Sequence, residues 1–213
     1  MVEVAIDVNH HIVAIRLVGN VWGEGTDLSI LGESGRKSIT SAFAHQEVLV
    51  DVAIIEIDGI KFGGCDGWYN DGYFGRQYPT ESFSRKSTNV MWRNIMNDAE
   101  FIYGVENFDD IFEIERLKIE KVFKECDVMI THINPSAKNE HINIRYQNNP
   151  SNVFFCFEGE KYLKNGNMKY WIFGHTHEEL EYIEHNVHCI CNPLGYFNES
   201  GNGKFVNIRT IEI

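Results

Sequence analysis

Short apolar runs separated by polar turns predict a chain that is rich in β-strands. Most runs are five to seven residues long, and they are bounded by residues that favour turns, as expected of strands. The pair Asp58-Gly59 separates two of these runs and is a strong signal for a hairpin. We expect strands over residues 2–6, 12–18, 53–57, 60–64, 127–131, 169–173, 179–184, 187–191 and 204–213.

Apolar residues at helical spacing predict helices between some of these strands. The clearest lies over 109–125, where acidic residues come early and lysines come late, in agreement with the helix dipole. Two further helices are expected over 87–99 and 158–164, and residues 65–83 are expected to form a long loop at the rim of a substrate site. This order of elements predicts an α/β fold with a mixed sheet and helical cover.

The size and charge of the chain narrow this picture. With 213 residues, of which 43% are hydrophobic, the chain can bury one core, so residues 1–213 are expected to form a single domain. Nineteen basic and 31 acidic residues give a net charge of −12. Long nucleic acid is therefore an unfavourable partner, and a phosphate site on this chain would need metal ions to supply positive charge.

The cysteines and the apolar runs predict the cellular compartment of the protein. Five cysteines are scattered through the chain, which is untypical of a disulfide framework and favours a reducing environment. The N-terminus lacks the pattern of a signal peptide, and no apolar run approaches the roughly 18 residues of a membrane span. We expect a cytoplasmic protein without a membrane segment.

Three of the predicted strands end in residues that can carry chemistry. The run 170–173 is followed by Gly174-His175-Thr176-His177, and the run 128–130 by Thr131-His132. A third strand, 187–191, breaks into Asn192-Pro193. Because open α/β sheets build their ligand sites at the carboxyl ends of strands, and because imidazole is a common metal ligand, these motifs predict a metal site.

In these motifs the chain resembles the calcineurin-like metallophosphoesterases, from about residue 54 to the C-terminus. The resemblance rests on Thr-His-x-x-Pro at 131–135, Gly-His-Thr-His at 174–177 and Asn-Pro-x-x-Tyr at 192–196, and it includes the hairpin at 57–60 and the segment 63–69. It implies an αββα sandwich of two mixed sheets. It also implies hydrolysis of a small phosphorylated substrate, with two divalent ions of Mn, Zn, Fe or Ni as cofactors.

Carried over from that family, His132 and His175 would bind one ion and His177 the other. Asn192 would shape the loop beneath the site. In such a reaction two ions polarise the phosphoryl oxygens and lower the pKa of a bridging water, while the protein mainly positions the reactants.

The first half of the family pattern is not recognisable here. The motifs Asp-x-His and Gly-Asp, which supply carboxylate ligands, are missing. For the motif Gly-Asn-His-Asp we favour Asn9 as a metal ligand and His10 as the catalytic residue. Gly19-Asn20 is an alternative match to this motif, and a polar turn without a functional role is an equally good interpretation of residues 8–11.

The resemblance thus implies a family member that is truncated at its N-terminus. Such a chain is expected to bind one ion or none and to hydrolyse phosphoesters poorly, and to associate with its own copies through an exposed sheet edge. The alternative is a non-catalytic fragment that serves as a scaffold or binding module. If carboxylates are hidden in the first fifty residues, the first suspects are Asp7, Asp27, Glu33 and Asp51.

Three other signals carry less weight. Residues 31–38 are similar to a nucleotide-binding loop, but their glycines are wrongly spaced. A second cluster could hold zinc, although buried cysteines in a core strand are the better interpretation; it consists of His185, His188, Cys189 and Cys191. A group of aromatic residues could stack on a substrate or anchor the loop, namely Trp68, Tyr69, Tyr73 and Phe74.

Overall fold

The computed structural model of the protein describes residues 2–6, 12–17, 54–102, 104–193 and 209–213. Asn9 and His10, the alternative pair at residues 19–20 and the segment 31–38 lie outside these ranges. The four acidic suspects of the N-terminal part lie outside them as well.

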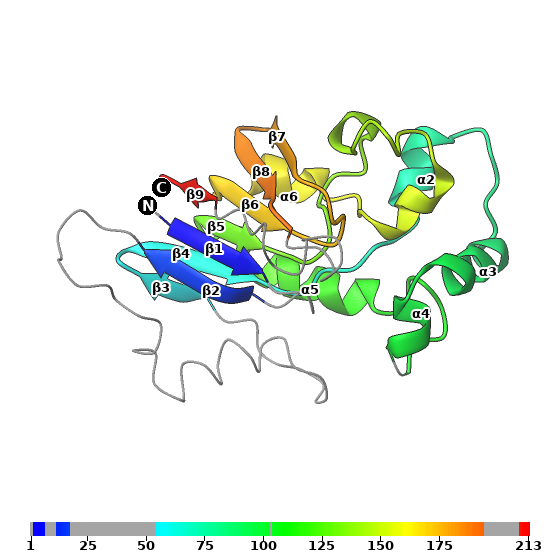
Figure 1. Ribbon diagram of the computed structural model, residues 1–213, viewed down its shortest axis with the longest axis horizontal. Coiled ribbons are helices and arrows are strands. Elements are labelled where there is room, and N and C mark those ends of the chain that lie inside the picture. Colours follow the sequence, from blue (N-terminus) through cyan, green and yellow to red (C-terminus); the bar gives the residue numbers. More distant parts are fainter. Residues whose placement is uncertain (1, 7–11, 18–53, 103, 194–208) are drawn as a thin grey trace, which may run out of the picture.

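A six-stranded mixed sheet forms the centre of the molecule (Figure 1). Its strand order is β3-β4-β5-β6-β8-β7; the inner strands run parallel, and the hairpins β3–β4 and β7–β8 add an antiparallel strand at either end. The strands are β3 (Ile55–Ile57), β4 (Ile60–Gly64), β5 (Val128–Ile130), β6 (Tyr170–Phe173), β7 (Leu180–Glu184) and β8 (Val187–Cys191). The apolar runs are buried here because parallel strands are covered on both faces.

A three-stranded antiparallel sheet lies against one face of the central sheet (Figure 1). It has the order β2-β1-β9 and consists of β1 (Val2–Ile6), β2 (Ile12–Leu17) and β9 (Thr210–Ile211). Ile211 and Ile213 pack on a small apolar cluster of the central sheet. The members of that cluster are Phe62, Val128, Ile130 and Ile172.

The helices and the larger part of the core cover the opposite face. Met129, Trp171 and Phe173 point into this core and are fully buried. Each such side chain contributes about 1.5–3 kcal/mol by leaving water. The covering elements are α2 (Gly72–Gln77), α3 (Arg85–Ile95), α4 (Asp98–Phe101), α5 (Phe112–Val122), η2 (Asn139–His141), η3 (Pro150–Phe154) and α6 (Glu160–Asn165). The described chain therefore has a mixed α/β fold.

Most of the predicted elements are confirmed, but two predictions need correction. The helix expected over 87–99 is broken at Met96, whose backbone is extended, so that α3 and α4 are separate. The loop expected over 65–83 contains α2, and its aromatic side chains are buried rather than available for stacking. They anchor this segment to the core, where Trp92 Nε1 donates to Tyr69 Oη at 2.6 Å. Within the described ranges, no helix has the length and apolarity needed to cross a membrane.

Candidate metal centre

Three neighbouring strands deliver their carboxyl ends to the same edge of the central sheet. Gly64 of β4 pairs with Ile130 of β5, and Ile130 pairs with Ile172 of β6. The pairing continues past the strand ends. His132 donates its backbone N–H to the Asp66 carbonyl at 2.6 Å, and accepts at its own carbonyl from the Gly174 N–H at 3.0 Å. The two predicted histidine motifs therefore lie side by side, as their positions at strand ends require.

The close approach of β4 to β5 depends on glycine. A Cβ atom at Gly64 would lie 2.1 Å from the Ile130 carbonyl oxygen, which is far inside van der Waals contact. Only glycine lets the chain reach this edge without displacing β5.

His132 and His175 converge at this edge. Their ring centroids are 4.6 Å apart, with an angle of 71° between the ring planes. His175 is buried and His132 is half-buried. The position of His132 is supported by Thr131, whose hydroxyl accepts from Trp171 Nε1 at 2.9 Å and donates to the Ile133 carbonyl at 2.7 Å.

The surroundings of His175 fix its protonation state and its tautomer. Burial lowers its pKa to about 4, the Phe154 carbonyl acts in the opposite direction, and the nearby His177 lowers the pKa further. The ring is therefore neutral at pH 7. Because Nε2 lies 3.0 Å from the Phe154 carbonyl oxygen, Nε2 carries the hydrogen, and Nδ1 keeps the lone pair that a metal would need.

The loop that carries His175 and His177 has an unusual backbone. Both residues have positive φ, 68° and 52°, a region that residues other than glycine seldom occupy. The turn is closed by a hydrogen bond from the Thr176 N–H to the Gly174 carbonyl at 2.9 Å. Such backbone strain concentrates at functional sites, where the surrounding structure holds it in place.

The predicted ligand set is brought together only in part. His177 lines the same pocket as His175 and affects its pKa. Asn192 is half-buried and follows directly after β8. Among the described residues, however, these histidines do not form a set of three ligand atoms within 4.8 Å of one another.

Asp66 is a residue at this edge that the sequence analysis did not single out. It follows β4 at the position where His132 follows β5, and the two are joined through the backbone. Its side chain is exposed. The neighbouring Cys65 is buried, and burial raises the pKa of its thiol well above the ordinary value, so Cys65 is unsuited to act as a nucleophile. The signal that could have identified Asp66 is its place two residues after a buried strand.

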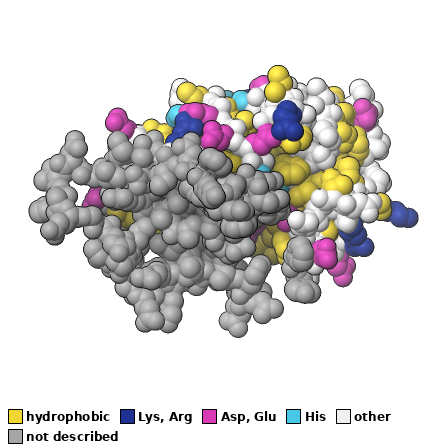
Figure 2. Space-filling model, viewed as in Figure 1, with side chains coloured by type: hydrophobic (Ala, Val, Ile, Leu, Met, Phe, Trp, Pro, Cys, Tyr) yellow, Lys and Arg dark blue, Asp and Glu magenta, His cyan; other side chains and the backbone are white. Residues whose placement is uncertain are grey.

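A pocket of about 410 Å³ opens beside His175 and His177. Its walls come from the end of α3 and the start of α4, from the segment 141–156 and from the loop 175–180. In the space-filling view, a patch of hydrophobic side chains lies on the right half of the molecule, and basic and acidic side chains lie directly beside it as well as at the edge of the view (Figure 2). A pocket next to convergent polar groups is the usual form of a small-molecule site.

A second cluster of potential ligands lies elsewhere and already contains cations of the chain. Atoms of Glu160, Glu184 and His185 lie within 4.8 Å of one another. Lys138 Nζ is 2.5 Å from Glu184 Oε1 and 3.4 Å from Glu160 Oε1, and Arg76 Nη2 is 2.8 Å from Glu160 Oε2. The position that a metal would take is thus filled by the Lys138 ammonium group. Among the described residues, no close set of three ligand atoms forms around Cys189 and Cys191, whose side chains are buried in the core.

Comparison with known proteins shows likeness only to solved structures. No family model and no curated protein matches the sequence. Among solved structures, the phosphopantetheinyl hydrolase (PptH) from Mycobacterium tuberculosis is similar at 12% sequence identity and a TM-score of 0.48. The likeness covers 75% of this chain and 59% of that protein, so the chain spans less than two thirds of its length. A likeness this distant assigns no function.

Proposed function

We propose that this chain is a metal-dependent phosphoesterase of the calcineurin-like type, acting on a small phosphorylated substrate. The observation that carries the proposal is the convergence of His132 and His175, 4.6 Å apart, from two adjacent strand ends. The pocket beside them provides space for a substrate. The two stacked sheets with helices on the outer face of the larger one are consistent with an αββα sandwich.

In this proposal two of the described residues, His132 and His175, would hold a divalent ion. His175 offers Nδ1 in a neutral ring, and His132 lies against it. His177 and the Asp66 carboxylate are the candidates to complete the site, and Asn9 remains the proposed ligand from the N-terminal part. Imidazole-rich sites favour borderline ions such as Zn²⁺ and Ni²⁺, while a carboxylate improves the binding of Mn²⁺.

The chemistry of this site divides between ion and protein. A bound ion would supply a hydroxide at neutral pH and polarise the phosphoryl oxygen. The protein's own part is to hold His175 in one tautomer through the Phe154 carbonyl and to place the ester in the pocket beside it. We retain His10 as the proposed catalytic residue.

The test compares His175→Ala with His188→Ala. His188 is a matched control because it lies on β8, pairs with Glu181 and is remote from the pocket lining. With Mn²⁺ present, the unmodified chain should hydrolyse p-nitrophenyl phosphate or its diester slowly. His175→Ala should lower this turnover by more than about 100-fold, since loss of a ligand exceeds the 10–100-fold typical of its supporting contacts.

A second readout does not depend on turnover. Calorimetric titration with Zn²⁺ should give a binding isotherm that His175→Ala abolishes and His188→Ala preserves. Equal turnover and equal zinc binding in the two variants would contradict the proposal.

A non-catalytic binding module is the second candidate. It is favoured by the incomplete set of ligands among the described residues and by the burial of Cys65. Zinc binding that depends on His175, without hydrolysis of either ester, would support this candidate.

A further inference from the structure

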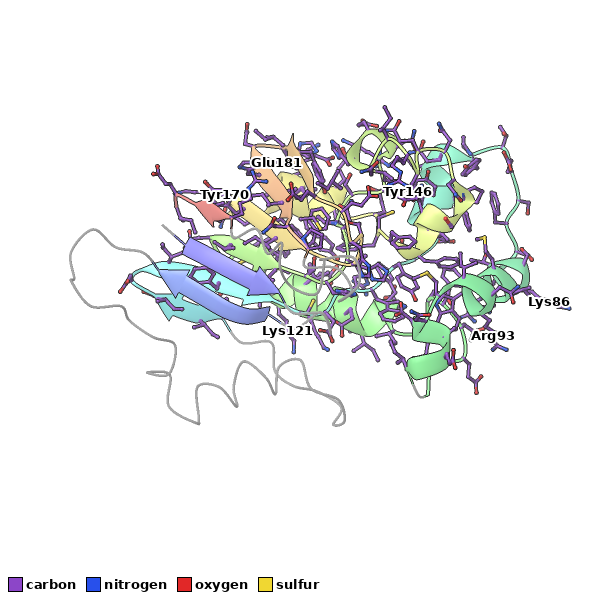
Figure 3. The ribbon with its side chains drawn as sticks, in the orientation of Figure 1. Lys86, Arg93, Lys121, Tyr146, Tyr170 and Glu181 are labelled. Atoms are coloured by element: carbon purple, nitrogen blue, oxygen red, sulfur yellow. The ribbon has the colours of Figure 1, made fainter. Side chains whose placement is uncertain are left out.

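The pocket beside His175 and His177 has an unusual balance of charge for a site that handles phosphate. No lysine or arginine is found among the described residues that line it. Two acids, Asp98 and Glu178, do line it. Two of the three basic residues of the nearby α3, Lys86 and Arg93, lie at the outer side of that helix (Figure 3), and the third, Arg85, pairs with Asp109 and Asp110. A second anionic group on a ligand inside the pocket would thus meet the acids of its lining, and the nearest arginine contact is that of Arg145 with Glu178 at the rim.

Glu178 carries the clearest sign of a missing partner. Its Oε1 accepts from Arg145 Nη1 at 3.1 Å, at the exposed rim of the pocket. Its Oε2 is buried and receives no hydrogen bond from any described residue. A buried carboxylate oxygen without a donor is costly, so this atom favours a ligand that brings a hydrogen-bond donor.

Apolar side chains complete the wall. Ile142, Tyr146 and Phe155 line the same pocket, and Tyr146 lies between the β7–β8 hairpin and α2 (Figure 3). The Tyr146 ring already has the Arg145 guanidinium over it, 5.4 Å from its centroid. This wall suits a short carbon chain that ends in a hydrogen-bond donor.

We propose that this pocket binds the alcohol part of a phosphomonoester and selects alcohols that are cationic over neutral ones and neutral ones over anionic ones, with Glu178 as the residue that senses the charge. The inference rests on the proposed function, because it takes the phosphoryl group to lie at the histidines. It adds the class of substrate: a small amino alcohol carrying a single phosphate.

Three esters that differ mainly in one charge test the proposal on the full chain with Mn²⁺. The alcohol part ends in an ammonium group in phosphoethanolamine, is uncharged in ethyl phosphate and ends in a carboxylate in phosphoglycolate. We expect kcat/KM and calorimetric affinity to fall in that order, by about tenfold or more from first to last, which corresponds to about 1.4 kcal/mol.

The variant Glu178→Gln keeps the shape of the side chain and removes its charge. It should bring the three esters to within about threefold of one another. Glu140→Gln is the matched control, because Glu140 is an exposed acid on η2 that does not line the pocket, and it should keep the order. The same order in Glu178→Gln as in the unmodified chain, or a preference for phosphoglycolate, would overturn the inference.

The two readouts separate this inference from the proposed function. Ordered binding that depends on Glu178, without turnover of any ester, would support the pocket and contradict the phosphoesterase. Turnover of the esters without the expected order of affinities would support the phosphoesterase and contradict the proposed selectivity of the pocket. Neither binding nor turnover would overturn both. Thermal melting of each variant shows whether a loss reflects the pocket or the fold.

Discussion

Two clusters of titratable side chains in this molecule differ in a way that composition does not reveal. The cluster of Glu160, Glu184 and His185 has the carboxylates that metals prefer, yet Lys138 and Arg76 already neutralise them. The pair of His132 and His175 offers imidazole nitrogens only, but it lies beside a pocket, and Nε2 of the buried His175 ring is held by the Phe154 carbonyl.

The difference shows that the chemical type of the ligand atoms is a weaker guide to a metal site than the charged groups of the protein that already contact those atoms. A carboxylate paired with an ammonium group is a structural ion pair, because the attraction that would bind a metal is already satisfied. The described contacts of His175 are instead with the Phe154 carbonyl and with the rings of Tyr69, His132 and Phe155. The less typical set of ligands is therefore the better candidate for a functional site.

The largest expected effect comes from removing the cation of the acidic cluster. Lys138→Met keeps the length of the side chain but leaves Glu184, whose side chain is only 4% exposed, without its ion pair at 2.5 Å. Breaking a buried pair from one side should lower the free energy of unfolding by about 3–5 kcal/mol. Urea unfolding at pH 7 measures this loss.

The matched control for this variant is Arg85→Met. Arg85 also pairs with acids, Asp109 and Asp110, but its side chain is 55% exposed. Its loss should cost no more than about 1 kcal/mol. Equal losses of stability in the two variants would contradict the comparison. So would a chelator that destabilises the unmodified chain when the substitution Lys138→Met has no effect on stability, because the acidic cluster would then be a metal site.

The histidine edge could be predicted from the sequence because its signal is local. His132 and His175 each lie two residues after a short buried run, and parallel strands bring such positions to one edge. The same reasoning applied to β4 indicates Asp66, which lies two residues after the end of that strand at Gly64. The clearest local signal in this part of the chain is the hairpin turn at Asp58-Gly59, which lies at the opposite end of β4.

The acidic cluster and the pocket could not be predicted, because both depend on contacts between distant parts of the chain. Lys138 meets Glu184 across 46 positions, since 184 − 138 = 46, and no periodic pattern encodes that meeting. The helix α2 was missed for a similar reason. Its glycines and polar residues disfavour a helix locally, and it is held by the burial of Tyr73 and Phe74.

An effect of middle size is expected at the histidine edge itself. Thr131→Val preserves the volume but removes the hydroxyl that accepts from Trp171 Nε1 and donates to the Ile133 carbonyl. Leaving these buried groups without partners should cost about 1–3 kcal/mol in unfolding free energy. Because Thr131 precedes His132, zinc affinity should fall as well, by about 10–100-fold.

Thr131→Ser is the control for this change, since it retains the hydroxyl. It should keep the zinc affinity of the unmodified chain and lose less stability than the valine variant. Equal zinc affinity in Thr131→Val and Thr131→Ser would mean that this hydrogen bond does not position His132.

The smallest effect concerns the response of the acidic cluster to pH. Hydrogen bonds from Arg76 and then from His185 lower the pKa of Glu160 to about 2, below the value of about 4.3 expected in the unfolded chain. A lowered carboxyl pKa stabilises the fold fully above the unfolded value, and this stability is lost as the pH falls from about 4.3 towards 2. The Glu160 side chain is 37% exposed, so solvent screening keeps the contribution below about 1 kcal/mol.

Urea unfolding of the unmodified chain and of Glu160→Gln at pH 6 and pH 3 isolates the contribution of Glu160, because titrations common to both chains cancel in the difference. The unmodified chain should lose more stability between the two pH values, and 0.5 M salt should narrow the gap. An identical loss in both chains would show that Arg76 and His185 do not hold Glu160 ionised, and the acidic cluster would then be less completely neutralised than its geometry indicates.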